Sequence, residues 1–309
     1  MRELMALLSR QAFAGYPDEY LLARLRGRRA KLGSEHHSPA AVAGMTDADA
    51  WDRLRSEYRW VYRQMNAGLR LIFAPLFLWF ELRTIILCLR FRRSGERLQA
   101  AGLLPASLLA KRVQQTLETE GEPATVINDL ASILATVAEP YRNLGELYRQ
   151  RGGRELEQRF VTLYLERMTV LPLHPLLQEF FRALVDMRNL VTLAKQIRWQ
   201  VNESQAFIRG GEITPARLGK ALTEGTAAGL NALLAGLPDM SVLPPDQLNP
   251  EQQLYGWLTR KVRRLGRDPL GIGLILDYLW GCFVEAHDLS LTIHGQELES
   301  DTLRAELIR

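Results

Sequence analysis

Apolar side chains recur at every third or fourth position along most of the chain, which is the spacing of one face of an α-helix. Trp51, Leu54, Tyr58 and Val61 form one such series. No run of β-branched residues alternates with polar residues for more than four positions, as a strand would require. The pattern therefore predicts an all-α fold.

Glycine, proline and capping residues divide this pattern into segments. A break rich in Gly, Ser, His and Pro covers residues 33–46, and a helix begins at Asp47. Thr214-Pro215 combines a Thr N-cap with proline at the first helical position. Pro105 is interpreted as the same kind of helix start. The further predicted helices cover residues 20–31, 69–92, 103–119, 124–137, 141–164, 175–199, 251–267 and 270–293, with Gly295 as a C-terminal stop and a last helix entered near Ser300.

Two short motifs recur three times along the chain, about a hundred residues apart. A pentapeptide motif contains an acidic residue, a spacer, a basic residue, a small polar residue and an aliphatic one, and a hexapeptide motif lies downstream of it. Self-similarity at a fixed period indicates a modular body. It predicts three similar helical units, residues 1–120, 121–236 and 237–309, in one continuous all-helical chain. The pentapeptides are Glu81-Leu82-Arg83-Thr84-Ile85, Asp186-Met187-Arg188-Asn189-Leu190 and Glu285-Ala286-His287-Asp288-Leu289, and the hexapeptides span residues 103–108, 213–218 and 298–303.

The acidic residue of each pentapeptide lies at the edge of an apolar helix face, because residues four positions apart share a face. One interpretation is that each carboxylate pairs with an arginine of the same or a neighbouring helix and fixes the packing. The other is that the three sites face a common axis or cavity and bind a partner. The candidate structural or partner-binding positions are Glu81, Arg83, Asp186, Arg188, Asn189, Glu285 and Asp288.

Motifs that carry chemistry are missing from the sequence. It contains no phosphate-binding G-x-x-x-x-G-K-[ST], no dinucleotide-binding G-x-G-x-x-G after a strand, no H-E-x-x-H and no G-x-S-x-G. An all-helical prenyl-transfer enzyme would need D-D-x-x-D pairs to hold magnesium, and none occurs. Cys88 and Cys282 have neither disulfide nor metal spacing and are interpreted as buried thiols of a reducing compartment. We therefore expect no catalytic site, cofactor, metal or small-molecule substrate.

Basic residues concentrate in two of the predicted helices, residues 20–31 and 260–267. The net charge is only +4, which is weak evidence for nucleic acid, and no aromatic residues are interleaved with the basic ones for base readout. A solvated helix face is the simplest interpretation. Contact with acidic protein loops or lipid headgroups stays open.

The most apolar stretch, residues 69–91, is interrupted by charged residues such as Glu81 and Arg83 and by Pro75. A central charge costs roughly 2 to 3 kcal/mol in a bilayer, so a buried core helix is the better interpretation. The first ten residues hold no apolar run typical of a signal peptide. We therefore expect a cytoplasmic protein without a membrane span.

With these features the chain resembles the C subunit of archaeal and bacterial V/A-type ATP synthases, equivalent to the d subunit of the vacuolar proton pump. The family's acidic-x-R-N-L signature is matched by residues 186–190, whereas the first copy has Thr84 for Asn and the third has His287-Asp288 for Arg-Asn. Further similarity lies in Tyr20-Leu21-Leu22-Ala23-Arg24-Leu25-Arg26, close to Y-x-x-A-R-x-R, in Phe207-Ile208-Arg209-Gly210-Gly211 before Ile213, and in residues 285–307.

The resemblance implies three helical units arranged about a pseudo-threefold axis as a funnel. It also implies a non-catalytic central-stalk subunit on the cytoplasmic face of the membrane, which links the proteolipid rotor ring to the central-shaft subunits and transmits torque during ATP synthesis or proton and other ion transport. A free-standing helical adaptor that binds other proteins on a solenoid surface is the alternative. An all-helical enzyme would need convergent carboxylates in an apolar pocket.

Overall fold

The computed structural model describes residues 2–32, 44–201, 207–238, 240, 250–295 and 307–308. Helices dominate this part of the chain, and its only β-type pairing is an isolated antiparallel bridge between Leu8 and Leu109. The predicted all-α class is confirmed for these residues. They cluster into two compact units, each assembled from two separate stretches of sequence. The predicted division at residues 120 and 236, the funnel and the pseudo-threefold axis stay predictions.

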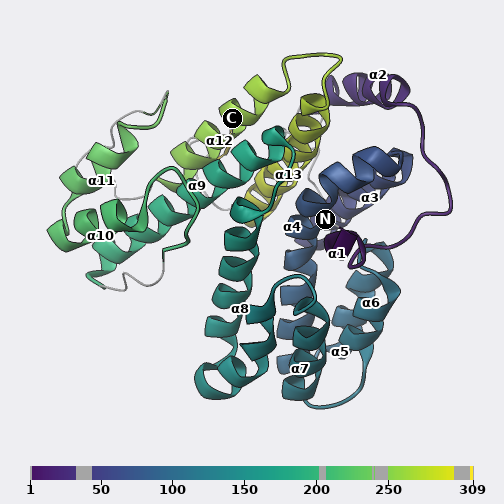
Figure 1. Ribbon diagram of the computed structural model, residues 1–309, viewed down its shortest axis with the longest axis horizontal. Coiled ribbons are helices and arrows are strands. Elements are labelled where there is room, and N and C mark those ends of the chain that lie inside the picture. The colour runs from purple at the N-terminus through teal and green to yellow at the C-terminus, as the bar shows by residue number, and fades with distance from the viewer. Residues whose placement is uncertain are drawn as a thin grey trace. The chain divides into compact units, whose positions relative to one another are not determined.

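Unit 1 comprises Met1–Asp18 and Arg55–Leu177, and its centre is the helix α4 (Ala67–Arg93). The side chain of Asn66 caps the start of α4 by accepting from the backbone nitrogen of Leu69 at 3.0 Å. The other helices of unit 1 pack around α4 (Figure 1). The other elements of unit 1 are α1 (Arg2–Met5), α5 (Arg97–Leu103), η1 (Leu104–Ala106), α6 (Lys111–Glu118), α7 (Pro123–Leu134), η2 (Glu139–Asn143) and α8 (Leu144–Val170).

Among the described helices, α4 alone is long and apolar enough to cross a membrane by length and composition. Most of its apolar stretch is nevertheless buried in the fold, and Arg70, Glu81 and Arg92 are buried with it. Each of these charged side chains forms hydrogen bonds to neighbouring segments of unit 1. This arrangement agrees with the predicted core helix.

Unit 2 comprises Glu19–Leu54 and Gln178–Arg309. Its helices α12 (Glu251–Leu265) and α13 (Gly273–His294) pack against each other, and the indole nitrogen of Trp280 donates to the Thr259 hydroxyl at 2.9 Å between them. Three helices contribute residues to both units, and they are α2 (Asp18–Arg29), with Asp18 alone in unit 1, α3 (Asp47–Gln64) and α9 (Pro175–Trp199). The other elements are α10 (Pro215–Glu224) and α11 (Ala227–Leu234).

The predicted helix starts and stops agree with the structure at several points and differ at one. α3 begins at Asp47, the Thr214 side chain caps α10, and Gly295 follows α13. The single helix predicted over residues 103–119 is wrong, because Pro105 begins only the 3₁₀ turn η1 and the chain is extended at Ser107 before α6. Because the backbone is extended at Ser107, the amide of Leu108 forms no helical hydrogen bond and can donate to a side chain. The predicted last helix near Ser300 lies outside the described residues.

Candidate functional site

The carboxylate of the first pentapeptide motif binds the extended segment that follows η1. The Glu81 side chain is only 6% exposed. Its Oε2 accepts from the Ser107 hydroxyl at 2.7 Å, and its Oε1 accepts from the backbone nitrogen of Leu108 at 2.6 Å. Burial raises the pKa of Glu81, while these hydrogen bonds and one from Thr84 act in the opposite direction.

The second motif repeats this arrangement in unit 2. Asp186 of α9 is 1% exposed, and its carboxylate accepts from the backbone nitrogens of Glu212 at 3.0 Å and Ile213 at 2.9 Å. Burial raises the pKa of Asp186 to about 6, against the opposite effect of the two backbone hydrogen bonds. The charge of Glu212 raises it further, and that of Lys261 lowers it.

In the second and third motifs, the polar residue one helical turn after the acid binds a downstream segment. Asn189 exchanges two hydrogen bonds with the backbone of Ile208, both of 2.8 Å. In the third motif Asp288 accepts from the backbone nitrogen of Ile308 at 2.9 Å. The contacts join residues 19 positions apart in the second motif and 20 apart in the third. Asn189 and Asp288 therefore hold their downstream segments in the same way.

The contacts correct the alignment of the hexapeptide motifs. Glu81 and Asp186 each reach a backbone amide 27 residues further along, at Leu108 and Ile213. A helix begins shortly after each of these amides, α6 at Lys111 and α10 at Pro215. Leu108 thus corresponds to Ile213 and not to Leu218, and the sequence match of Pro105 with Pro215 is displaced by five positions. The third hexapeptide, residues 298–303, lies outside the described residues.

The expectation that an arginine holds each carboxylate is wrong for Glu81 and Asp186. Their hydrogen bonds come from backbone amides, a serine and a threonine, and Arg55 is only the weakest influence on the pKa of Glu81. A buried carboxylate needs donors, and amides of an adjacent loop supply them at lower desolvation cost than a guanidinium. The sequence carries no side-chain signal for these contacts, because their donors include backbone amides 27 residues away.

The remaining candidate positions differ in their surroundings. Arg83 is exposed on α4, whereas Arg188 of α9 is half-buried and burial lowers its pKa. Glu285 of α13 is half-buried, one turn before the buried Asp288. Glu81 and Arg83 belong to unit 1, and the other candidates belong to unit 2. A common axis that all three motifs face stays a prediction.

Two buried arginines that the sequence analysis did not single out cap the ends of other helices. Arg70 donates to the carbonyl oxygens of Tyr62 at 3.1 Å, Arg63 at 3.1 Å and Phe13 at 2.8 Å. Arg92 likewise donates to the carbonyls of Leu117 and Thr119 at the end of α6. Carbonyl groups at a helix C-terminus lack partners within the helix, and a cation there satisfies them. For Arg70 the signal was a charged residue inside the most apolar stretch of the sequence, residues 69–91, and Arg92 follows that stretch directly.

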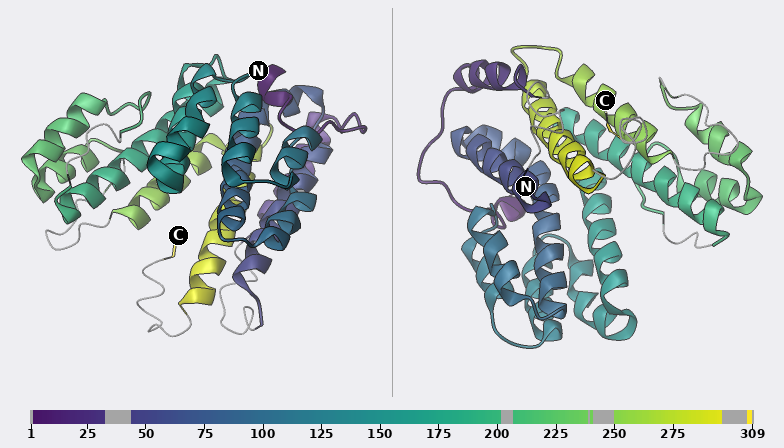
Figure 2. Two further views of the ribbon diagram at one scale, coloured as in Figure 1. Left: turned by 90° about the horizontal axis from the view of Figure 1, so that it is seen from below. Right: turned by 180° about the vertical axis from the view of Figure 1, so that it is seen from behind.

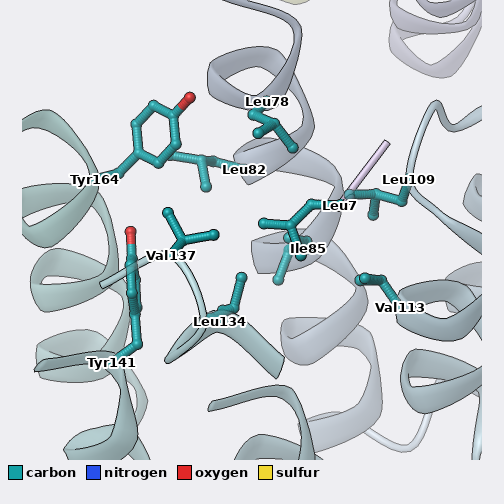
Figure 3. Close-up of a pocket in the computed structure, with 10 residues that line it drawn as sticks. All are labelled: Leu7, Leu78, Leu82, Ile85, Leu109, Val113, Leu134, Val137, Tyr141 and Tyr164. Atoms are coloured by element: carbon teal, nitrogen blue, oxygen red, sulfur yellow. The ribbon is translucent and has the colours of Figure 1, made fainter. Parts of the chain in front are cut away.

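Unit 1 also contains a small apolar cavity of about 20 Å³ (Figure 3). Its lining is aliphatic apart from Tyr141 and Tyr164, and the Tyr164 hydroxyl donates to the carbonyl oxygen of Pro75. Pockets for small molecules typically measure about 300 to 1,000 Å³, so this cavity is a packing defect. Within the residues that the structure describes, no cluster of His, Cys, Asp and Glu could hold a metal ion. Both cysteines are buried and free, as expected.

Comparison with known proteins gives one family match. A family model described as ATP synthase (C/AC39) subunit matches residues 22–305, which is nearly the whole chain. The match includes all three pentapeptide motifs and the loops that Glu81 and Asp186 bind. No curated protein matches the chain.

Proposed function

Because the chain belongs to the ATP synthase (C/AC39) subunit family, we propose that it is the non-catalytic central-stalk subunit that couples the rotor ring of a V/A-type ATPase to the central shaft. The observation that carries this proposal is the family match over residues 22–305. The subunit then sits at the cytoplasmic face of the membrane, attached through the proteolipid ring. Its partners are ring and shaft subunits, and it needs no cofactor of its own.

The internal contacts of the two units support a mechanical role. A part that transmits torque must resist deformation, and close packing together with hydrogen-bonded loops provides resistance. Glu81 in unit 1 and Asp186 in unit 2 each hold the segment between two helices by the backbone. Such contacts do not depend on flexible side-chain pairs at the surface. In this proposal the pentapeptide motifs are internal ties of a three-unit socket.

The proposal is tested by purifying the tagged chain from native membranes with a mild detergent. We expect the proteolipid ring and the shaft subunits to be recovered with it in constant ratio. A parallel purification from untagged cells identifies proteins that bind the resin alone. Recovery of the chain only from the soluble fraction, without ring and shaft, would overturn the proposal and favour a free-standing adaptor.

Coupling itself needs a second measurement on the complex. Complexes that lack this chain should hydrolyse ATP at the catalytic head, because the head contains its own active sites. They should not drive ion transport into vesicles, and re-adding the purified chain should restore transport. Ion transport at the normal rate without the chain would contradict the coupling role.

A further inference from the structure

We infer that the C-terminal ends of α2 and α12 together form a basic surface in unit 2 that binds the anionic headgroups of a lipid bilayer. This surface goes beyond the coupling role, which concerns protein partners. The two basic segments lie more than two hundred residues apart in sequence. The surface consists of Arg26, Arg28 and Arg29 from α2 with Arg263, Arg264 and Arg267 at the end of α12.

Direct contacts join the two helix ends. One guanidinium nitrogen of Arg29 donates to the carbonyl oxygen of Gly266 at 3.3 Å, and the other lies 2.7 Å from the Asp277 carboxylate. Leu32, just after α2, packs on α13 so closely that a Cβ on Gly281 would lie 3.0 Å from its methyl carbon. Figures 1 and 2 show α2 beside the turn between α12 and α13.

Neutralisation of helix ends does not account for the charge collected there. Each helix C-terminus carries about half a negative charge, so two ends need about one positive charge between them. Asp268 follows α12, and Asp277 of α13 already pairs with Arg29. The six arginines at the two helix ends outnumber these two carboxylates and the charges of the helix ends. Arg26, Arg263 and Arg267 are all exposed to solvent.

The turn that follows α12 presents an apolar side chain beside these arginines. Leu270 is 70% exposed, and its backbone nitrogen donates to the Asp268 carboxylate at 2.9 Å. The backbone nitrogen of Gly271 also donates to the Asp268 carbonyl, at 3.2 Å, so the turn is fixed by two hydrogen bonds. A rigid apolar tip beside a cluster of arginines is the combination that membrane-surface segments use.

The chemistry of the surface favours lipid over an acidic protein loop. Guanidinium groups bind phosphate oxygens through two parallel hydrogen bonds, and arginine predominates at the two helix ends, where Lys31 follows α2 and Lys261 lies in α12. An acidic loop would match the charge but would leave Leu270 in water. A bilayer accepts both, because the leucine enters the interface while the arginines stay at the headgroups. The inference of a lipid partner also rests on the proposed function, which places the subunit at the membrane surface.

Co-sedimentation of the purified full-length chain with lipid vesicles tests the inference. Vesicles of phosphatidylcholine mixed with phosphatidylglycerol should bind the chain about 100-fold more tightly than phosphatidylcholine alone, since the exposed Arg26, Arg263 and Arg267 each contribute about fivefold. High salt should remove this preference. Equal binding to both vesicle types, or a preference for soluble poly-glutamate over anionic vesicles, would overturn the inference.

Two matched double variants test whether this surface, and not the net charge of the protein, causes the preference for anionic vesicles. Arg263→Glu with Arg267→Glu should abolish the preference, whereas Arg142→Glu with Arg149→Glu, two exposed positions of unit 1, should retain most of it. Each arginine-to-glutamate change lowers the net charge by two, so each double variant has a net charge of zero in place of +4. Equal losses in the two variants would show non-specific attraction and overturn the inference.

A second pair tests the apolar tip. Leu270→Ser should weaken vesicle binding severalfold, and Leu98→Ser, which changes a 90% exposed leucine of α5, should leave it unchanged. Thermal melts confirm that all variants are folded. Because no ring or shaft is present in this assay, failure of vesicle binding leaves the coupling role intact. Loss of ring and shaft recovery from membranes would instead refute the coupling role and leave vesicle binding standing.

Discussion

The carboxylate of Glu81 on α4 lies 2.6 Å from the backbone nitrogen of Leu108. Leu108 also offers its carbonyl oxygen to the backbone nitrogen of Ser9 at 2.7 Å. A single buried acid thus fixes a residue that in turn fixes the N-terminal segment. Glu81 holds three parts of unit 1 together: the core helix, the segment after η1 and residues 7–9.

Replacement of Glu81 by alanine should destabilise the protein by about 2 to 4 kcal/mol, because it removes buried volume and leaves the Leu108 amide and the Ser107 hydroxyl without an acceptor. Urea denaturation measures this free energy of unfolding. Glu139→Ala is the control, since that side chain is 71% exposed, and it should change stability by less than about 0.5 kcal/mol. Equal stabilities of the two variants would contradict the role of Glu81.

The raised pKa of Asp186 predicts a pH dependence with a definite sign. The group titrates near 3.8 when the chain is unfolded and near 6 when it is folded, so between these values the folded state keeps a proton that the unfolded state has lost. Its contribution to stability is therefore complete below about pH 4 and decreases by about 3 kcal/mol as the pH rises through 6.

Asp186→Asn should remove this dependence, because asparagine does not titrate. The measurement compares urea denaturation of the two proteins across the same pH series, and the difference between them isolates this group from all others. An exposed substitution, Asp268→Asn, serves as the control and should run parallel to the unchanged protein. Parallel curves for Asp186→Asn as well would refute the prediction.

Two glycines of the same region should respond in opposite directions to alanine. A Cβ on Gly211 would lie 2.1 Å from the Asp186 carboxylate, so Gly211→Ala must displace the loop and should cost about 2 kcal/mol or more. Gly219 lies inside α10 with no atom within 4 Å of a built Cβ, and Gly219→Ala should stabilise by about 0.5 to 1 kcal/mol. Thermal melts of the pair decide the matter, and a loss of stability at Gly219 would count against the described packing of α10.

Cys88 should be inert in the folded protein. Burial raises the pKa of its thiol to about 12, and its sulfur donates to the carbonyl oxygen of Ala100 at 3.6 Å. Because the thiolate is the reactive form, a disulfide reagent at neutral pH should leave Cys88 unmodified until urea unfolds the chain. Mass spectrometry of the labelled peptide reports the site. Rapid labelling of Cys88 under native conditions would show that α4 opens locally.

The sequence predicted the helical class and most helix positions because both depend on local periodicity. Asp47, Thr214 and Gly295 act through residues within one turn, so their roles as a helix start, a cap and a stop could be inferred without tertiary information. The partners of Glu81 and Asp186 lie 27 residues away and are backbone amides, which carry no side-chain signal. Side-chain pairing with arginine was the more obvious but incorrect hypothesis.

The alignment error at Pro105 has a similar origin. Proline begins a helix at Pro215 and only a short 3₁₀ turn at Pro105. The amide that the acid binds follows Pro105, at Leu108, but precedes Pro215, at Ile213. The local sequence around each proline does not show this difference in order. The basic segments of α2 and α12 lie far apart in sequence, and their proximity follows only from tertiary contacts such as that of Arg29 with Gly266.

Each unit is built from two separate stretches of sequence, and this has a consequence for biosynthesis. Residues 19–54 leave the ribosome early, whereas the rest of unit 2 begins at Gln178. The contacts of Trp51 with Phe283 and of Asp47 with Ser290 can form only after the later residues have been translated. Unit 1 can be completed while this stretch is still without its partners. Contacts of such long sequence separation form slowly and leave apolar surface open to aggregation. We therefore expect the nascent chain to need chaperone protection of residues 19–54 until its last third has been translated.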